Sequence, residues 1–331
     1  MKRIFAATLA LMLLLLGCAP ALAEADVEKT GVTMRVASLK GPTTMGLVKL
    51  MQDAEAGLTA NDYTFAMEGT ADAISPLLIR GELDAAMVPC NLAAVLINKT
   101  EGALSIAAIN TLGVLYVLEN GDSIQTVEDL RGKTIYSTGM GTTPEYALDY
   151  VLTRNGIDPD ADVNVEFKSE ATEVASAMLN DAASIAVLPQ PYVTAVLAQN
   201  PEVRVALSLT EEWDKVGDGS AMITGVCVVR NAFAEENPQA VAAFLEEYAA
   251  STEYVNANPA EAAEWIAELG IVAKAAMAEK AIPACNIVCI TGEEMVTKAS
   301  GYIDALYAMN PESVGGKPAD EAYFYTPDTQ G

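Results

Sequence analysis

An internal repeat with an offset of 100 positions dominates the first part of the chain. Gly41 and Gly141 are 100 positions apart, and so are Pro89 and Pro189. Each of these residues follows an apolar run with the length of a short buried strand and precedes a helical pattern. The repeat therefore predicts two similar α/β units that aim helix N-termini at a shared crevice.

The stretch 133–150 is the clearest copy of the repeated unit. It is predicted to form a buried strand, a turn containing Gly139 and Gly141, and a helix that opens at or just after Thr142. Thr142 and Glu145 have the spacing of a capping box. Such a unit directs unpaired backbone N–H groups out of the carboxyl edge of a sheet, which suits a small polar or anionic ligand.

Strand–helix alternation divides the chain into two predicted lobes. We assign residues 32–111 and 224–331 to lobe 1 and residues 112–223 to lobe 2. The chain would then cross between the lobes near 110–113 and near 222–225. Two such crossings predict a two-strand hinge that closes around a ligand.

The amino terminus has the pattern of an export signal. Residues 1–17 combine a basic start with an apolar run too short to span a bilayer comfortably. The run ends in Leu-Gly-Cys, which resembles the lipobox of bacterial lipoproteins, so Cys18 is the predicted lipid-bearing amino terminus and residues 18–31 a tether. Ordinary secretory cleavage after Ala23 is the alternative, and both pathways export the protein.

The composition excludes several kinds of chemistry. The 45 Asp and Glu residues against 19 Lys and Arg residues give a net charge of −26, which argues against nucleic acid and against a basic membrane-binding patch. The chain contains no histidine. Catalysis by Ser-His-Asp or Cys-His groups and metal sites that use imidazole are therefore excluded.

The cysteines other than Cys18 are predicted to be free. They are Cys90, Cys227, Cys285 and Cys289. Export permits disulfides, but the only close pair lies four residues apart in a predicted strand, which separates the two by ~13 Å. That distance is too long for a bridge, and the spacing is unusual for a zinc site.

Four loops after the repeated strands carry the candidate ligand-binding residues. Threonine hydroxyls beside free backbone N–H groups would suit a sulfonate, a nitrate or a carboxylate. Lys40 is the only cation in these loops, and Tyr192 could stack on a planar ligand. The structural alternatives are helix capping for the threonines and, for Glu145, interaction with its own helix N-terminus. The predicted ligand-binding residues are Lys40, Gly41, Thr43, Thr44, Asn91, Gly141, Thr142, Thr143, Gln190 and Tyr192.

Several stretches resemble one family of bacterial transport proteins. They are AAINTLGVLYVLE (107–119), VEDLRGKTIYSTGMGTTPEYAL (127–148), LPQPYVT (188–194) and the tail NPESVGGKPADEAYFY (310–325). With the lipobox and the duplicated units, they make the chain resemble the substrate-binding lipoproteins of bacterial ABC importers. The resemblance is to the family that handles nitrate, taurine, alkanesulfonates and thiamine-pyrimidine precursors.

The resemblance implies both a fold and a function. The fold is the periplasmic-binding-protein-like class II arrangement, in which two similar α/β lobes are joined by a two-strand hinge. The function is capture of a small polar, sulfonate-like or nitrate-like solute by a monomer on the outer face of the cell membrane. An ABC permease with its ATPase would receive the solute, and neither catalysis nor a cofactor is involved.

Three alternatives to this function stay open. The protein could bind a thiamine-pyrimidine precursor or another planar heteroaromatic for uptake, or it could present its solute to a sensory receptor. An enzyme on the same fold, such as a thiamine-pyrimidine synthase, is the least favoured alternative. The resemblance implies that fungal members of this enzyme class depend on histidine, and the chain contains none.

Overall fold

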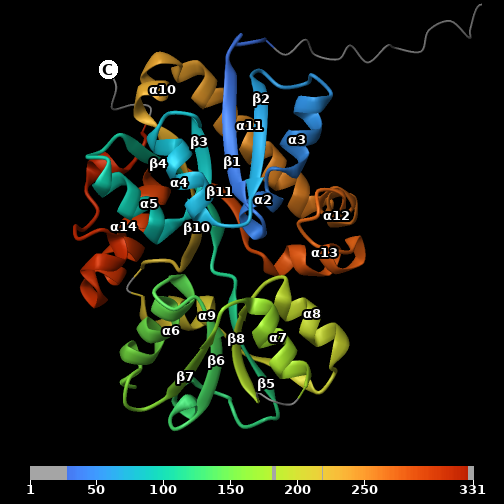
Figure 1. Cartoon of the computed structure of the whole chain (residues 1–331), viewed down its shortest axis with the longest axis vertical. Helices are drawn as coiled ribbons and strands as arrows, with labels where there is room; N and C mark the ends of the chain where they lie inside the picture. The colour runs from blue at the N-terminus through green and yellow to red at the C-terminus, as the bar shows by residue number, and fades with distance from the viewer. Residues whose placement is uncertain (1–27, 181–183, 218, 327–331) are drawn as a thin grey trace, which may run out of the picture.

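The computed structural model describes residues 28–326 except 181–183 and 218. Its elements form two β-sheets, sheet A and sheet B, which lie one above the other with helices around each (Figure 1). The predicted signal peptide, Cys18 and the tether up to residue 27 lie outside the described residues.

Sheet A has six strands in the order β11-β4-β10-β3-β1-β2. β1 is parallel to β2 and β3, whereas β10 is antiparallel to β3 and β4, and β11 is antiparallel to β4. The strands are β1 (Thr33–Leu39), β2 (Asp62–Glu68), β3 (Ala85–Pro89), β4 (Leu104–Leu112), β10 (Ile223–Arg230) and β11 (Ile287–Ile290).

Sheet B has five strands in the order β7-β6-β8-β5-β9. β6 is parallel to β7 and β8, and β5 is antiparallel to β8 and β9. The strands are β5 (Leu115–Asn120), β6 (Thr134–Thr138), β7 (Asn164–Lys168), β8 (Ile185–Pro189) and β9 (Val203–Ser208).

Helices cover the faces of both sheets (Figure 1). Those around sheet A are α2 (Pro42–Met45), α3 (Val48–Glu55), α4 (Ala71–Ile79), α5 (Cys90–Lys99), α10 (Asn231–Glu236), α11 (Pro238–Ala257), α12 (Pro259–Glu268), α13 (Ala275–Ala281) and α14 (Gly292–Met309). Those around sheet B are α6 (Thr143–Arg154), α7 (Ala171–Leu179), α8 (Tyr192–Gln199) and α9 (Leu209–Val216). Four short 3₁₀ turns among the described residues complete the elements: η1 (Val127–Leu130), η2 (Ile282–Ala284), η3 (Pro311–Val314) and η4 (Glu321–Tyr323).

The predicted internal repeat is confirmed. Helices α4 and α7 begin at Ala71 and Ala171, and strands β3 and β8 end at Pro89 and Pro189, so both pairs keep the offset of 100. In each sheet three parallel strands are joined through helices, as the alternation of patterns predicts. The two sheets are thus built from the same supersecondary unit.

Strand β4 extends to Leu112, into the region near 110–113 where the chain was predicted to cross between the lobes. Asn110 and Thr111 are polar, but both are fully buried within the sheet. Thr111 pairs with Gly225 of β10 and with Ile287 of β11. The passage from sheet A to sheet B is therefore restricted to the two residues between β4 and β5.

An aromatic stack joins helices from distant parts of the sequence. The rings of Tyr150 on α6 and Trp213 on α9 are stacked with centroids 3.8 Å apart, and Tyr302 on α14 lies 5.3 Å from Trp213. All three side chains are buried. This packing holds the C-terminal helix α14 against helices of sheet B, although α14 also contacts α5 and β4 of sheet A.

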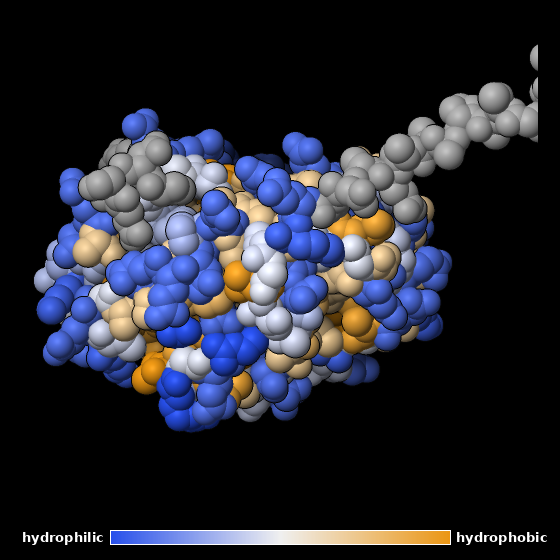
Figure 2. Space-filling view, turned by 90° about the horizontal axis from the view of Figure 1, so that it is seen from above, coloured by the Kyte–Doolittle hydropathy of each residue, from blue (hydrophilic) through white to orange (hydrophobic). Residues whose placement is uncertain are grey.

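The surface seen from the sheet A end is mostly hydrophilic, with hydrophobic residues scattered among polar ones (Figure 2). This distribution agrees with the acidic composition. None of the helices in the described part of the chain is long and apolar enough to cross a membrane.

Candidate functional site

The predicted site lies where parallel strands of both sheets end and helices begin. In sheet A, β1 and β3 lead into α2 and α5, and in sheet B, β6 and β8 lead into α6 and α8. Because the carboxyl ends of parallel strands share one edge of a sheet, this order places the helix N-termini of each sheet together. The predicted loop positions are partly wrong, because Asn91 lies in the first turn of α5, Thr43 and Thr44 lie in α2, and Tyr192 begins α8.

Two predicted site residues meet between the sheets. Thr143 opens α6 of sheet B, and its Oγ1 lies 3.3 Å from Oδ1 of Asn91 on α5 of sheet A, to which it donates a hydrogen bond. Both side chains are buried, at 7% and 9% exposure. Tyr116 of β5 makes a second connection, since its hydroxyl donates to the carbonyl of Ala284 at 3.0 Å. The helix starts of the two sheets therefore face each other, and the halves of the protein built on sheet A and sheet B are in contact.

The predicted residues of the first loop are arranged around the end of β1. Thr43 Oγ1 donates to the Leu39 carbonyl at 2.9 Å, and Thr44 Oγ1 donates to Ser38 Oγ at 2.8 Å. Gly41 precedes α2 with a φ of 142°, a conformation that glycine adopts at little cost. Lys40 is exposed, and its backbone N–H bonds to the last residue of β2. Direct contact of these residues with a solute stays a prediction.

The glycine-rich turn of the second unit is braced by its own side chains. Thr142 Oγ1 donates to the Gly139 carbonyl at 2.7 Å, and Glu145 accepts a hydrogen bond from the backbone N–H of Gly141. Thr142 is the N-cap residue of α6, but its side chain does not cap the helix, so the predicted capping box is wrong. Glu145 lies in the first turn of α6, which agrees with its predicted structural role.

The two remaining candidates lie around the start of α8. Gln190 is buried, and its Oε1 accepts hydrogen bonds from the backbone N–H and the hydroxyl of Thr194. Tyr192 is half-buried and packs against the core of sheet B with Tyr116 and Tyr136. Gln190 thus keeps its NH₂ group available to a solute, whereas its carbonyl is already engaged.

The hydroxyl protons of the four threonines are all directed at oxygen atoms of the chain itself. A hydroxyl carries a single proton and two lone pairs. In the conformation described, these threonines therefore offer acceptors rather than donors to a solute. An anion would have to be held by backbone N–H groups, or the hydroxyls would have to rotate.

Sequence reasoning missed a buried polar cluster behind α2. Asn110 donates from Nδ2 to the Thr43 carbonyl at 3.0 Å and so positions the first loop. Asn110 Oδ1, Tyr248 OH and Thr252 Oγ1 are buried without a hydrogen bond of normal geometry. Burial raises the pKa of Tyr248, and the neighbouring Thr252 and Asn110 partly oppose that effect. The available signal was a pair of polar residues, Asn110 and Thr111, inside an apolar strand pattern.

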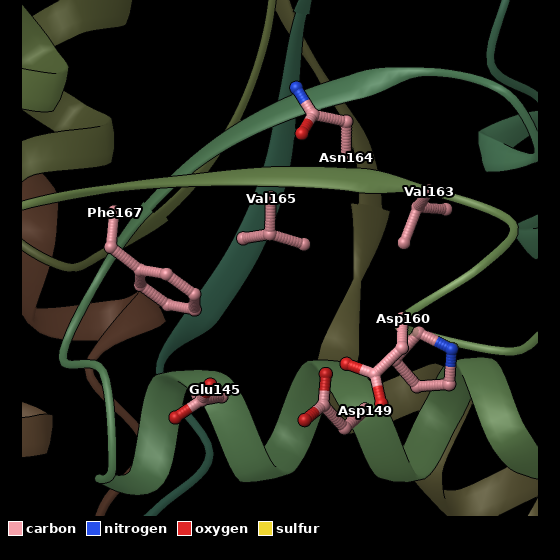
Figure 3. Close-up of a pocket in the computed structure, with 8 residues that line it drawn as sticks. Glu145, Asp149, Asp160, Val163, Asn164, Val165 and Phe167 are labelled. Atoms are coloured by element: carbon pink, nitrogen blue, oxygen red, sulfur yellow. The ribbon is translucent and has the colours of Figure 1, made fainter.

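An acidic cavity of about 230 Å³ lies beside the N-terminal half of α6. Figure 3 shows Glu145 and Asp149 pointing into it from α6 and Asp160 entering from the following loop, with β7 on the opposite side. Burial, followed by the negative charges of Glu145 and Asp160, raises the pKa of Asp149 to about 7. The cavity belongs to sheet B alone and is separate from the contact between the sheets.

Replacing Asp149 with asparagine is expected to stabilise the protein at pH 8 by about 1–2 kcal/mol, after allowance for partial solvent screening. The folded-state pKa of Asp149 is raised to about 7. Wild-type stability from this group is therefore present near pH 4 and is lost as the pH rises towards 7. Urea unfolding at pH 5 and pH 8 should show a larger gain at pH 8, and an equal gain at both would contradict the assignment.

The cysteines Cys90, Cys227, Cys285 and Cys289 are free, as predicted. The first three are buried and Cys289 is half-buried. Burial raises the pKa of Cys285 and Cys289 to about 12, so these thiols are not poised as nucleophiles at neutral pH. In the described part of the chain, no group of three or more Cys, Asp or Glu side chains could hold a metal ion.

The family model described as NMT1/THI5 like matches residues 103–262. This segment, just under half of the chain, is similar to the NMT1/THI5-like family. The matched segment contains the whole of sheet B together with strands β4 and β10 of sheet A. A comparison with curated proteins finds no match.

Solved structures extend the similarity beyond the matched segment. An ABC transporter protein from Parabacteroides distasonis has a TM-score of 0.75 and 22% identity, over 89% of this chain and 99% of that chain. The periplasmic aliphatic sulphonate binding protein SsuA from Escherichia coli has a TM-score of 0.72 and 14% identity, over 89% and 92%. The periplasmic nitrate-binding protein NrtA from Synechocystis PCC 6803 has a TM-score of 0.58 and 12% identity, over 89% and 85%. The predicted fold, that of periplasmic solute-binding proteins of ABC importers, is confirmed.

Proposed function

We propose that the protein is an extracytoplasmic solute-binding protein that captures a small polar solute between sheet A and sheet B. The observation that carries this proposal is the contact between Asn91 and Thr143, which joins the helix starts at the facing edges of the two sheets. A solute between these edges would meet backbone N–H groups from both sheets. The protein performs no catalysis and delivers its solute to an ABC permease.

The lobes of this binding protein are residues 32–111 with 224–331, and residues 112–223. They close as a hinge at the two passages between the sheets, and the protein acts as a monomer. Cys18 carries the lipid that holds it to the outer face of the cell membrane. The ten residues predicted from the sequence contribute the solute contacts.

The first candidate solute is a small sulfonate or nitrate. It is supported by the helix N-termini of both sheets, and the names of similar solved proteins include sulphonate and nitrate binding. The second candidate is a neutral planar heteroaromatic. It is supported by the acceptor character of the four threonine hydroxyls and by the half-buried rings of Tyr116, Tyr136 and Tyr192, which pack against one core cluster of sheet B.

A thermal-shift screen of the mature protein would decide between the two solute classes. Methanesulfonate, nitrate, acetate and uracil would be tested as probes at pH 7. A probe at ~100 times its dissociation constant should stabilise the fold by ~2.7 kcal/mol. A shift with methanesulfonate or nitrate supports the anion, and a shift with uracil supports the heteroaromatic. If no solute in a wider panel of both classes raises the melting temperature, the proposed function is wrong.

Replacing Thr143 with valine is expected to weaken binding of the solute found in that screen about tenfold. The change removes a buried hydrogen bond between the sheets, which is worth about 1 kcal/mol or more. Isothermal titration calorimetry would measure the affinity. Thr153→Val, at an exposed position on the same helix, is the matched control and should bind as the wild type does. Equal affinity of the Thr143→Val variant and the wild type would show that the hydrogen bond between Thr143 and Asn91 does not contribute to solute binding.

A further inference from the structure

The acidic cavity beside α6 is connected to the glycine-rich turn of the proposed solute site. Glu145 lines the cavity and also accepts the hydrogen bond from the Gly141 N–H group. Asp149 lies four residues further along the same helix, so both carboxylates occupy one face of α6 (Figure 3). One side chain, that of Glu145, therefore belongs both to the cavity and to the turn.

The cavity contains no positive charge to balance its carboxylates. Helix α6 contributes Glu145 and Asp149, the loop before β7 contributes Asp160, and β7 contributes Asn164, Val165 and Phe167. None of the residues that line the cavity is a lysine or an arginine. The nearby Asp162 does not add to the cluster, since it is paired with Arg131 and is not among the residues that line the cavity.

We propose that protonation of the group formed by Glu145, Asp149 and Asp160 regulates solute capture by the Gly139–Gly141 turn. With one proton bound to this group, the Glu145 carboxylate keeps the hydrogen bond from the Gly141 N–H group, and the turn keeps the arrangement described above. Loss of that proton releases the turn and weakens solute binding. This inference rests on the proposed function, because the turn is part of the proposed solute site.

Electrostatics sets the direction of the effect. Like charges four residues apart on a helix repel each other, and a half-buried cavity screens that repulsion less than bulk water does. When Asp149 loses its proton, Glu145 can reduce the repulsion by swinging out towards solvent. The Gly141 N–H group then loses its acceptor. Gly139 and Gly141, with φ of 72° and 73°, can leave these conformations cheaply because glycine also populates other regions.

The protonation step falls within a useful pH range, since Asp149 has a pKa of about 7. Below this pH Asp149 carries a proton, and above it Asp149 is charged. The hydrogen bond between the Gly141 N–H group and Glu145 is therefore expected to be formed at pH 6 and weakened at pH 8.

Hydrogen exchange measured by mass spectrometry tests the switch without any solute. In the wild type, the peptide that contains Gly139–Thr142 should lose about threefold protection between pH 6 and pH 8, after correction for intrinsic exchange rates. The Asp149→Asn variant should show the same protection at both pH values. Glu202→Gln removes an exposed carboxylate elsewhere on the sheet B half and should respond to pH as the wild type does. Equal protection of the wild type at both pH values would overturn the proposal.

A second measurement connects the turn to binding. Methanesulfonate and uracil do not change charge between pH 6 and pH 8, so either probe reports on the protein alone. The probe that binds should bind about threefold more weakly at pH 8 than at pH 6, and Asp149→Asn should abolish the difference. A pH-independent affinity in the wild type would overturn the regulation. If neither probe binds, the solute assignment fails, while the exchange experiment still decides whether the switch exists.

Discussion

Replacing Asp84 with alanine is expected to lower the free energy of unfolding by about 3–4 kcal/mol. The carboxylate is 1% exposed and lies between Arg35 of β1 and Arg230 of β10. Its oxygens accept bonds from Arg35 Nε at 2.8 Å and Nη2 at 2.6 Å, and from Arg230 Nη2 at 3.2 Å. One side chain at the start of β3 thus connects three neighbouring strands of sheet A, and its loss leaves two guanidinium groups without their partner.

The pH dependence of the Asp84→Ala variant tests the mechanism of this loss. Hydrogen bonds and charge interactions with the two arginines hold the pKa of Asp84 below its usual value, against the effect of burial. The stability that it contributes is present above the unfolded-state pKa of ~3.9 and is lost as the pH falls through the folded-state pKa. The difference between variant and wild type should therefore be full at pH 7 and shrink in acid.

Urea unfolding at pH 7 and at pH 3.5 measures both effects of Asp84. Glu82→Gln is the control, because Glu82 and its partner Arg80 are both 55% exposed and such surface pairs contribute little. We expect this control to unfold as the wild type does. If Asp84→Ala lowers the free energy of unfolding by less than about 1 kcal/mol, water solvates the two guanidinium groups in place of the carboxylate, and the prediction is wrong.

Replacing Gly225 with alanine is expected to cost about 2–3 kcal/mol and to disturb the first loop of the proposed site. A Cβ atom at this position would lie 2.4 Å from Asn110 Oδ1 and 2.7 Å from Thr43 Cγ2. Neither atom can move freely, because Asn110 also holds the Thr43 carbonyl. The added methyl group must therefore displace α2 or the strand beneath it.

Chemical unfolding and solute titration of the Gly225→Ala variant should show both losses together. Gly69→Ala is the matched control, since nothing lies within 4 Å of its Cβ position and the residue is exposed. That variant should keep wild-type stability and affinity. Normal solute affinity in a destabilised Gly225→Ala variant would separate Thr43 from the solute site.

The repeat predicted the architecture because each unit is locally consistent. Strand, turn and helix signals recur with one offset, and the observed starts of α4 and α7 keep it. Errors appeared where tertiary contacts override local patterns. Asn110 lies in the region of the predicted crossing, yet the sheet buries it and uses its amide to hold α2. Asn91 was predicted to lie in a loop, yet α5 already begins at Cys90 with Pro89 as its N-cap residue.

The chemistry of the candidate site was harder to predict than its place. The sequence identifies threonines at helix starts, but the rotamer of a hydroxyl decides whether it donates or accepts. Thr142 was expected to cap α6 and instead bonds the carbonyl of Gly139. The raised pKa of Asp149 could not be predicted from the i, i+4 spacing to Glu145 alone, because its largest cause is burial, which depends on how β7 and the loop before it pack against α6.

Both ends of the described chain belong to sheet A. The first strand is β1, and near the other end the N–H of Tyr325 bonds to the carbonyl of Ile106 in β4. A mechanical force applied between the two ends would therefore run through sheet A and shear its strands. Sheet B, inserted between β4 and β10, lies outside this load path. The aromatic stack on α14 is the exception, because it ties the inserted half to the C-terminal part of the chain, so a change in the orientation of sheet B must either carry α14 along or break this stack.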